Sequence, residues 1–133
     1  MKKKIAILGS TGSIGKTTFE ILKKKKNMFE VQLLTTNKNI NELIKQSKIF
    51  NVKNLIITDK KQFLVAKKKL QNKRINIFNN FNCFNQIFKK KIDYTMSSIS
   101  GLDGLEPTLN IIKFTKKIAI ANKEAIICAW NLI

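Results

Sequence analysis

The sequence has few of the side chains that most often carry out chemistry. It contains no histidine, two cysteines and eight acidic residues among 133. The cysteines, Cys83 and Cys128, stand too far apart to suggest a disulfide framework or a zinc site, which favours a reducing, cytoplasmic location. The acidic residues are scattered, and none are paired in a way that would hold a hard cation. We therefore expect no catalytic and no metal-binding residues in this chain.

Long hydrophobic runs are also missing. After the basic start, the first apolar run covers only residues 5–8, whereas a secretory signal needs roughly 7–15 apolar residues. Asn122, Lys123 and Glu124 interrupt the most hydrophobic region, so no stretch approaches the roughly 18–20 residues that span a bilayer. The sequence predicts a soluble protein without a membrane partner.

Negative charge is scarce: 26 basic residues face 8 acidic ones, for a net charge of +18. Clustered lysines can bind nucleic-acid phosphates. However, Arg74 is the only arginine, and the abundance of lysine, asparagine and isoleucine is what an AT-biased coding sequence would produce. Runs at residues 23–26, 67–69 and 89–91 fall near expected helix ends, where the helix dipole favours cations. We expect no specific nucleic-acid partner, with a basic nucleotide- or RNA-binding module as an alternative.

What the sequence does contain is a repeated alternation of short apolar runs with stretches of helical periodicity. At 133 residues and 44% hydrophobic content, the chain suits one domain. Because parallel neighbours need crossover connections, the alternation predicts an α/β, Rossmann-like, doubly wound and mostly parallel sheet with helices on both faces. The expected strands cover residues 4–8, 30–35, 54–58, 75–78, 92–96 and 117–121.

Four stretches between and after these strands place apolar residues on one helix face. These faces comprise Ile14, Thr18, Ile21 and Leu22; Ile40, Leu43, Ile44 and Ser47; Leu105, Leu109 and Ile112; and Ile126, Ala129, Trp130 and Ile133. The only proline, Pro107, suits the first turn of the third helix. No cap or polar tail follows the fourth helix, residues 124–133, which predicts a truncated chain.

The most informative segment is GSTGSIG, residues 9–15, directly after the first expected strand. Gly9 would permit the tight turn, Gly12 would let the backbone approach a pyrophosphate, and Gly15 would let helix and sheet pack closely. Amides at the helix start would meet the phosphate charge. These three glycines predict a dinucleotide-binding loop, with a purely structural turn as the alternative.

A phosphate-binding P-loop is a rival for the same segment, because Gly15, Lys16 and Thr17 match the end of a Walker A motif. Residues 55–59 could imitate the associated Walker B strand. The P-loop pattern requires glycine at position 10, which is Ser10, so the loop is one residue too long. This reading is therefore disfavoured.

The end of the second expected strand distinguishes the two nicotinamide cofactors. NAD-binding domains usually place an acidic residue there, whereas the 2′-phosphate of NADP needs hydroxyl, amide or basic donors. The sequence offers Asn37, Lys38 and Asn39 after two threonines, with no carboxylate. NADPH is therefore expected, although Lys38 could be merely solvated and Asn39 merely a helix N-cap.

Two later loops also fall at the carboxyl ends of strands, where open α/β sheets bind ligands. In residues 96–104, Ser97 and Ser98 could face a cofactor. In residues 121–125, Asn122, Lys123 and Glu124 place amide, cation and carboxylate in a row. The alternative for the second loop is an ordinary cap, with Asn122 as N-cap.

Other enzymes with glycine loops fit less well. A short-chain dehydrogenase needs a tyrosine four residues before a lysine, but Ser98 occupies that position after Tyr94, the only tyrosine. A semialdehyde dehydrogenase needs an activated cysteine, and neither cysteine stands beside an obvious base or helix amino end. That second option stays open.

Together, ILGSTGSIG, the pair Lys38 and Asn39, GLDGLEPTL and IAIANKEA resemble the 1-deoxy-D-xylulose 5-phosphate reductoisomerase family, and the resemblance runs the whole length. It implies that residues 1–133 form the amino-terminal NADPH-binding domain. The family isomerises and reduces a phosphorylated sugar, 1-deoxy-D-xylulose 5-phosphate, to 2-C-methyl-D-erythritol 4-phosphate, in isoprenoid precursor synthesis.

The resemblance also implies roles for individual residues. The pyrophosphate and neighbouring cofactor groups would contact Thr11, Gly12, Ser13 and Ile14. The adenosine phosphate would lie near Asn37, Lys38 and Asn39, and the cofactor site would be completed by Asn122 and Glu124. Lys123 would reach the substrate. Asn37 stands where the family usually has glycine.

The family's Mg²⁺ or Mn²⁺ site lies in a downstream segment with serine, acidic residues and histidine, which this chain lacks. Without a metal ion, negative charge developing during the rearrangement would not be stabilised. The resemblance therefore implies that catalytic and carboxyl-terminal domains are absent and that this fragment alone is inactive. The full-length family commonly forms homodimers.

Overall fold

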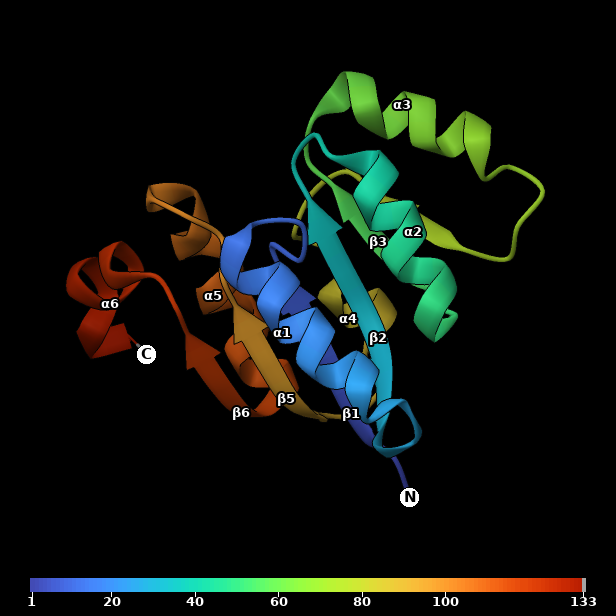
Figure 1. Cartoon of the computed structure of the whole chain (residues 1–133). Helices are drawn as coiled ribbons and strands as arrows, with labels where there is room; N and C mark the ends of the chain where they lie inside the picture. Colours follow the sequence, from blue (N-terminus) through green and yellow to red (C-terminus); the bar gives the residue numbers. More distant parts are fainter. Residues whose placement is uncertain (133) are drawn as a thin grey trace.

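Strands and helices alternate along the chain, as the apolar periodicity predicts. The computed structural model describes residues 1–132, and the strands pair only in parallel in this part of the chain, in the order β4-β3-β2-β1-β5-β6 (Figure 1). Their bounds are Lys3–Leu8 (β1), Phe29–Thr36 (β2), Asn54–Ile57 (β3), Asn76–Phe78 (β4), Ile92–Ser97 (β5) and Thr115–Ile120 (β6). The α/β, Rossmann-like, doubly wound fold is confirmed, and all six expected strands are present with shifted ends.

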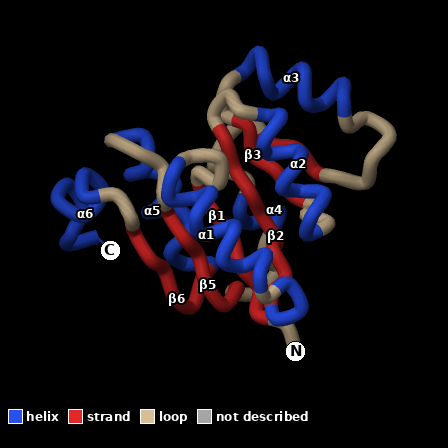
Figure 2. Tube along the Cα trace, viewed as in Figure 1, coloured by secondary structure: helices blue, strands red, loops and turns tan. Residues whose placement is uncertain are grey.

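Helices cover both faces of this sheet (Figure 2). The α-helices are Ser13–Lys24 (α1), Ile40–Phe50 (α2), Lys60–Lys69 (α3), Phe84–Ile87 (α4), Leu105–Ile111 (α5) and Lys123–Ala129 (α6). Short 3₁₀ helices occupy Lys26–Met28 (η1), Leu102–Gly104 (η2), Ile112–Phe114 (η3) and Trp130–Leu132 (η4). In Figure 1, α1 and α2 lie in front of the sheet, and α4 and α5 lie behind it. The order in which successive strands are added reverses at β1, so the switch point of the sheet lies between the carboxyl ends of β1 and β5.

The core is divided by the sheet into two apolar clusters. Successive residues of β1 alternate between them, because side chains of a strand point to opposite faces. Ile7 packs with the cluster under α1 and α2, which includes Phe19 and Leu43. Leu8 packs with the cluster under α4 and α5, which includes Phe84. Both faces of the central strand are therefore buried, as parallel sheets require.

The expected inner face of α1 is partly wrong. Leu22 is buried as expected, but Ile14 and Ile21 are 47% and 61% exposed, and the helix buries Gly15 and Phe19 in their place. The ring of Phe19 packs edge-on against Phe50 of α2, with centroids 5.4 Å apart. Because Gly15 must sit against the preceding loop, the helix is rotated relative to the face that the isoleucines indicate.

The buried faces of α2 and α5 can likewise be compared with the faces expected from the sequence. On α2, Ile40, Leu43 and Ser47 are buried as expected, while Ile44 is half-buried. On α5, the fully buried residues are Pro107, Thr108 and Ile111 rather than the expected Leu105, Leu109 and Ile112, which are half-buried. The backbone enters this helix from η2, and this rotates Thr108 towards β5, where its hydroxyl meets that of Ser97 at 2.6 Å.

The last helix is shorter than expected. It ends at Ala129 and continues as η4, and it buries Ala125 and Ala129, while Ile126 is half-buried and Trp130 is 69% exposed. Ile133, the last residue of the expected face, lies outside the described residues. Only small side chains face inward here because α6 packs closely against α5 and η2.

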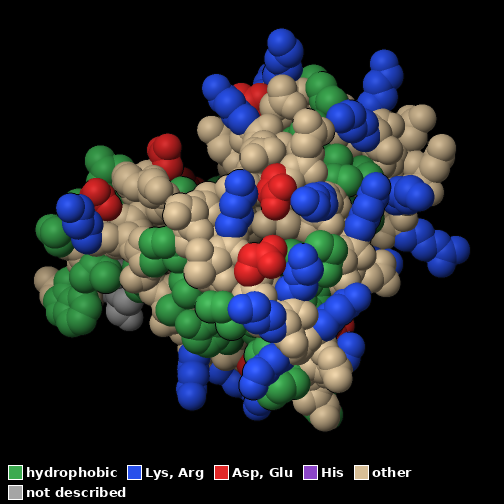
Figure 3. Space-filling view, in the orientation of Figure 1, with side chains coloured by type: hydrophobic (Ala, Val, Ile, Leu, Met, Phe, Trp, Pro, Cys, Tyr) green, Lys and Arg blue, Asp and Glu red, His purple; other side chains and the backbone are tan. Residues whose placement is uncertain are grey.

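The surface separates charge from apolar side chains. Figure 3 shows lysines spread over the visible face, while hydrophobic side chains gather over the α6 end of the molecule. The exposed apolar residues there include Ile127, Trp130 and Leu132. Within residues 1–132, no helix combines the length and apolar character needed to cross a membrane.

Candidate functional site

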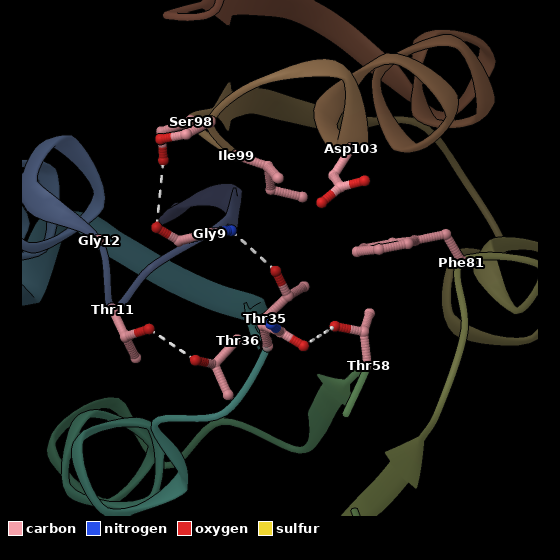
Figure 4. A pocket seen from close by; sticks show the side chains of 12 residues that line it. Gly9, Thr11, Gly12, Thr35, Thr36, Thr58, Phe81, Ser98, Ile99 and Asp103 are labelled. Carbon is pink, nitrogen blue, oxygen red and sulfur yellow. Dashed lines mark hydrogen bonds between the residues drawn. The ribbon is translucent and has the colours of Figure 1, made fainter. Parts of the chain in front are cut away.

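A cleft of about 460 Å³ lies at the carboxyl ends of β1, β2, β3 and β5 (Figure 4). It therefore opens at the switch point of the sheet, where doubly wound folds bind ligands. Its lining consists of Gly9, Thr11, Gly12, Thr35, Thr36, Asn37, Thr58, Phe81, Ser98, Ile99, Ser100 and Asp103.

The three glycines of residues 9–15 differ in how much space surrounds them. Gly9 has φ +77°, and a Cβ there would lie 3.0 Å from the Ser98 carbonyl oxygen. A Cβ on Gly15 would collide with the Gly9 carbonyl oxygen and approach the Ser10 Cα to 2.7 Å. Gly12 is open, since the nearest atom to a Cβ would be 3.7 Å away. Gly9 and Gly15 are therefore needed by the loop itself, whereas Gly12 leaves room beside the cleft.

Hydrogen bonds hold the glycine loop against the end of β2. The Gly9 N–H donates to Thr35 Oγ1 at 2.8 Å, and the Ser10 N–H donates to the Thr35 carbonyl oxygen at 2.9 Å. The hydroxyls of Thr11 and Thr36 share a hydrogen bond of 2.6 Å, visible in Figure 4. The loop thus has a defined shape without any ligand.

The first turn of α1 borders the cleft through its N-cap residue, Gly12, and has unused donors. Gly12 caps the helix without a side-chain hydrogen bond, and the first turn contains no acidic residue. The first amide to bond within the helix is that of Lys16, which donates to the Gly12 carbonyl oxygen at 2.8 Å. The amides of Ser13, Ile14 and Gly15 therefore have no partner inside the helix. Together with the helix dipole, they can stabilise an anion such as a phosphate.

The segment after β2 contributes Asn37 to the cleft and leaves Lys38 exposed outside its wall. Asn37 Oδ1 accepts a hydrogen bond from Thr58 Oγ1 at 3.0 Å. Asn37 does not have a positive φ, so asparagine is accommodated here without the left-handed backbone that favours glycine. Asn39 Oδ1 accepts from the Glu42 N–H at 3.2 Å and caps α2, as the alternative reading of this residue predicts.

The far wall of the cleft comes from the segment after β5 and from the segment after β4. Ser98 Oγ donates to the carbonyl oxygens of Leu8 and Gly9, at 2.8 and 3.3 Å. Ile99 and Asp103 face Phe81 across the opening in Figure 4. Among the lining residues, Asp103 is the one with an ionisable side chain. The cleft is therefore lined by hydroxyls, backbone and apolar side chains despite the strongly basic composition.

Asn122, Lys123 and Glu124 lie outside the cleft lining. Asn122 is 4% exposed, and its Oδ1 accepts from the Ala125 N–H at 3.2 Å, which caps α6. Its Nδ2 donates to the carbonyl oxygens of Ile99 and Gly101, at 2.5 and 2.7 Å. Asn122 thus fastens the far wall of the cleft from behind, while Lys123 is exposed and Glu124 half-exposed.

The structure brings together only part of the expected cofactor site. Of the expected residues, Gly9, Thr11, Gly12 and Asn37 line the cleft. Ser13, Ile14 and Gly15 adjoin it through the start of α1. The expected loop at residues 96–104 does supply Ser98, Ile99, Ser100 and Asp103 to the cleft, whereas Ser97 is buried against Thr108. Sequence reasoning did not assign Thr58 or Phe81 to the site. Thr58 ends an expected strand and could have been found by that rule, whereas no local pattern marks Phe81.

Cysteine chemistry receives no support from Cys83. This residue is buried, and burial raises the pKa of its thiol from 9.0 to about 11, against a smaller opposing effect of a backbone hydrogen bond. An activated nucleophile needs a lowered pKa. Cys128 is exposed on α6, away from the cleft. Within residues 1–132, no group of three or more histidine, cysteine, aspartate or glutamate side chains could hold a metal ion.

Comparison with known proteins resolves the alternatives left by the glycine loop. The family model described as 1-deoxy-D-xylulose 5-phosphate reductoisomerase matches residues 5–130. The chain belongs to this family. The match covers nearly the whole chain and includes both the glycine loop and the loop at residues 121–125. This assigns the glycine loop to a reductoisomerase rather than to a P-loop protein or a semialdehyde dehydrogenase.

Individual members of the reductoisomerase family agree in sequence and in fold. The enzyme of this name from Pelagibacter ubique is 60% identical over 98% of this chain. The solved reductoisomerase of Zymomonas mobilis, in complex with NADPH, superposes with a TM-score of 0.88 at 30% identity over 99% of this chain. A second solved structure, a reductoisomerase with NADPH, fosmidomycin and magnesium, gives a TM-score of 0.85 at 25% identity over 96% of this chain. This chain spans 34%, 35% and 32% of those proteins, respectively.

Proposed function

We propose that this chain is the NADPH-binding part of a 1-deoxy-D-xylulose 5-phosphate reductoisomerase. The main observation behind this proposal is the cleft at the switch point of the sheet. There the amino end of α1, which has no side-chain cap, lies beside the end of β2, which has no carboxylate. Unused amides suit a pyrophosphate, and the missing carboxylate suits a 2′-phosphorylated ribose. The NADPH named with the Zymomonas mobilis relative agrees with this chemistry.

Within that site, we place the pyrophosphate against the loop of Thr11 and Gly12 and the amides of Ser13 and Ile14. Open space at Gly12 supports this placement. The 2′-phosphate would lie near the segment that follows β2, whose members are Asn37, Lys38 and Asn39. Lys38 is exposed, so its ammonium group is available to pair with that phosphate.

The reaction as a whole is also a proposal, because the chain spans about a third of its relatives. We propose that the complete enzyme isomerises and reduces 1-deoxy-D-xylulose 5-phosphate to 2-C-methyl-D-erythritol 4-phosphate. Mg²⁺ or Mn²⁺ would stabilise the charge that develops during rearrangement. Lys123 would contact the phosphorylated sugar, and Asn122 and Glu124 would complete the cofactor site from the side of α6.

Three further expectations belong to the same proposal and rest on the resemblance. The complete enzyme would act as a homodimer in the cytoplasm. It would have no specific nucleic-acid partner. The complete enzyme would be active, whereas this chain alone would bind cofactor without turning over substrate.

The test is a titration of the purified chain with NADPH, NADH and ATP at two salt concentrations, repeated with Lys38→Glu. We expect preference for NADPH and a loss of about tenfold in NADPH affinity in Lys38→Glu, because a carboxylate would repel the 2′-phosphate. The matched control is Lys45→Glu, which makes the same charge change on an exposed residue of α2 outside the cleft.

Two outcomes would contradict the proposal. Binding of ATP without NADPH would favour a P-loop function for residues 9–17. Equal losses in Lys38→Glu and Lys45→Glu would mean that only net charge matters, which would remove the assignment of the 2′-phosphate to Lys38.

A further inference from the structure

Gln46 of α2 reaches the glycine loop from a distance of 36 residues in the sequence. Its side chain is buried, at 2% exposure, and Nε2 donates to the Ser10 carbonyl oxygen at 3.0 Å. Ser10 is fully buried, and both its N–H and its hydroxyl donate to the Thr35 carbonyl oxygen, at 2.9 and 3.2 Å. The Ser10 backbone is therefore held by β2 on one side and by α2 on the other.

The second amide atom of Gln46 makes this residue unusual. Oε1 is buried and accepts no hydrogen bond from the described residues. Burying an acceptor without a partner is unfavourable, and the other buried residues of α2 are Ile40, Leu43 and Ser47, whose hydroxyl is bonded within the helix. Packing alone would be served better by an apolar side chain. The one polar contact that Gln46 makes is with the glycine loop, which points to a role in the loop.

The geometry of the peptide unit shows how the hydrogen bond from Gln46 to the Ser10 carbonyl oxygen affects the loop. A trans peptide is planar, and its C=O and N–H point in opposite directions. The peptide that joins Ser10 to Thr11 has its C=O directed at Gln46, so its N–H is directed away from α2. Thr11 and Gly12 follow at once and line the cleft. Holding the carbonyl therefore sets the direction of the Thr11 amide before any ligand arrives.

We propose that Gln46 is a positioning residue for the dinucleotide pyrophosphate, which it does not touch. It fixes the Ser10–Thr11 peptide so that the loop presents its amides in one orientation. A preorganised donor avoids the reorganisation that a free loop would need on binding. This inference rests on the proposed cofactor function and deepens it.

The experiment compares Gln46→Met with Ser47→Ala in the complete 133-residue chain. Methionine has a similar length and volume but cannot donate. Ser47 is the matched control because it is equally buried on the same helix and its hydroxyl bonds only to Ile44 of that helix, at 2.7 Å. Each variant is titrated with NADPH and with adenosine 2′-monophosphate, which lacks the pyrophosphate.

For Gln46→Met, we expect NADPH affinity about tenfold lower, from the loss of one well-placed hydrogen bond to a charged group, with adenosine 2′-monophosphate affinity unchanged. Ser47→Ala should change neither affinity more than about twofold. Unchanged NADPH affinity in Gln46→Met would overturn the inference. Equal losses for both ligands would also overturn it, because they would indicate general disruption of the cleft.

Amide hydrogen exchange of Ser10, whose N–H donates to the Thr35 carbonyl oxygen in the loop that Gln46 contacts, separates this inference from the proposed function. We expect faster exchange in Gln46→Met than in Ser47→Ala, measured without ligand. If the wild-type chain fails to bind NADPH, the proposed function fails, while slower or equal exchange in Gln46→Met would independently overturn the role of Gln46. If Gln46→Met does not fold, Gln46→Asn, whose amide is one methylene too short to reach Ser10, is measured in the same way.

Discussion

The loop at residues 9–15 and the loop at residues 121–125 both follow a parallel strand and both open a helix. The first leaves its helix uncapped and its donors unused beside the cleft. In the second, the side chain of Asn122 caps α6 and uses both amide hydrogens on the carbonyls of Ile99 and Gly101. The first loop leaves backbone donors free beside the cleft, and in the second the Asn122 side chain is bonded within the protein.

This difference shows how the two loops cooperate. Asn122 holds the segment after β5, and that segment supplies Ile99, Ser100 and Asp103 to the cleft. Close packing at this point also requires Gly104, where a Cβ would collide with Asn122 Nδ2. The second loop therefore builds the wall that faces the first loop.

The largest expected effect is on stability and comes from removing the side-chain hydrogen bonds of Asn122. Asn122→Ala should lower the free energy of unfolding by about 3 kcal/mol, because a helix cap is worth about 1 kcal/mol and two carbonyls lose their donors. Urea denaturation measures this change. Asn122→Asp keeps the acceptor for the Ala125 amide but places a buried carboxylate oxygen against the carbonyl oxygens of Ile99 and Gly101, so at neutral pH its loss should be at least as large. If both variants are as stable as the wild type, Asn122 is not what holds residues 99–101.

The next largest effects distinguish Gly15, which the loop needs for stability, from Gly12, which borders the cleft. Gly15→Ala should cost about 2 kcal/mol of stability, because the new methyl group would collide with the Gly9 carbonyl. Gly12→Ala should leave stability within about 0.5 kcal/mol but weaken NADPH binding about tenfold, since its methyl group would fill the open space beside the cleft. Thermal unfolding and cofactor titration on both variants separate the two results. Equal effects on stability would contradict the distinction.

The smallest expected effect is on NADPH affinity and concerns the negative charge of Asp103 at the cleft. Asp103→Asn should raise NADPH affinity by about twofold to threefold at low salt, because it removes a negative charge near a polyanionic cofactor. Glu106→Gln is the matched control, since Glu106 is exposed on α5 outside the cleft lining. Titration at two salt concentrations checks both variants. The same gain in the control would show that net charge, rather than the position of Asp103, is responsible.

Much of the fold was predictable because its determinants are local. Strand and helix positions follow from apolar periodicity, and the glycine loop follows from a motif placed between a strand and a helix. The inner faces of α1 and α5 were not fully predictable. Phe19 is buried while Ile14 and Ile21 are exposed, because the position of Gly15 against the loop sets the rotation of α1, and apolar spacing alone does not specify that contact.

The alternation of strands and helices, the glycine loop and the absence of a carboxylate after β2 are all encoded locally in the sequence. Each of these depends on residues close together in the chain. Only the tertiary structure decided that Phe81 and Asp103 line the cleft, that Asn122 holds its far wall, and that Gln46 holds the loop. These contacts join residues separated by 21 to 36 positions along the chain or bring separate loops to one cleft. They exist because crossover connections carry distant segments to the same edge of the sheet, which local spacing does not encode.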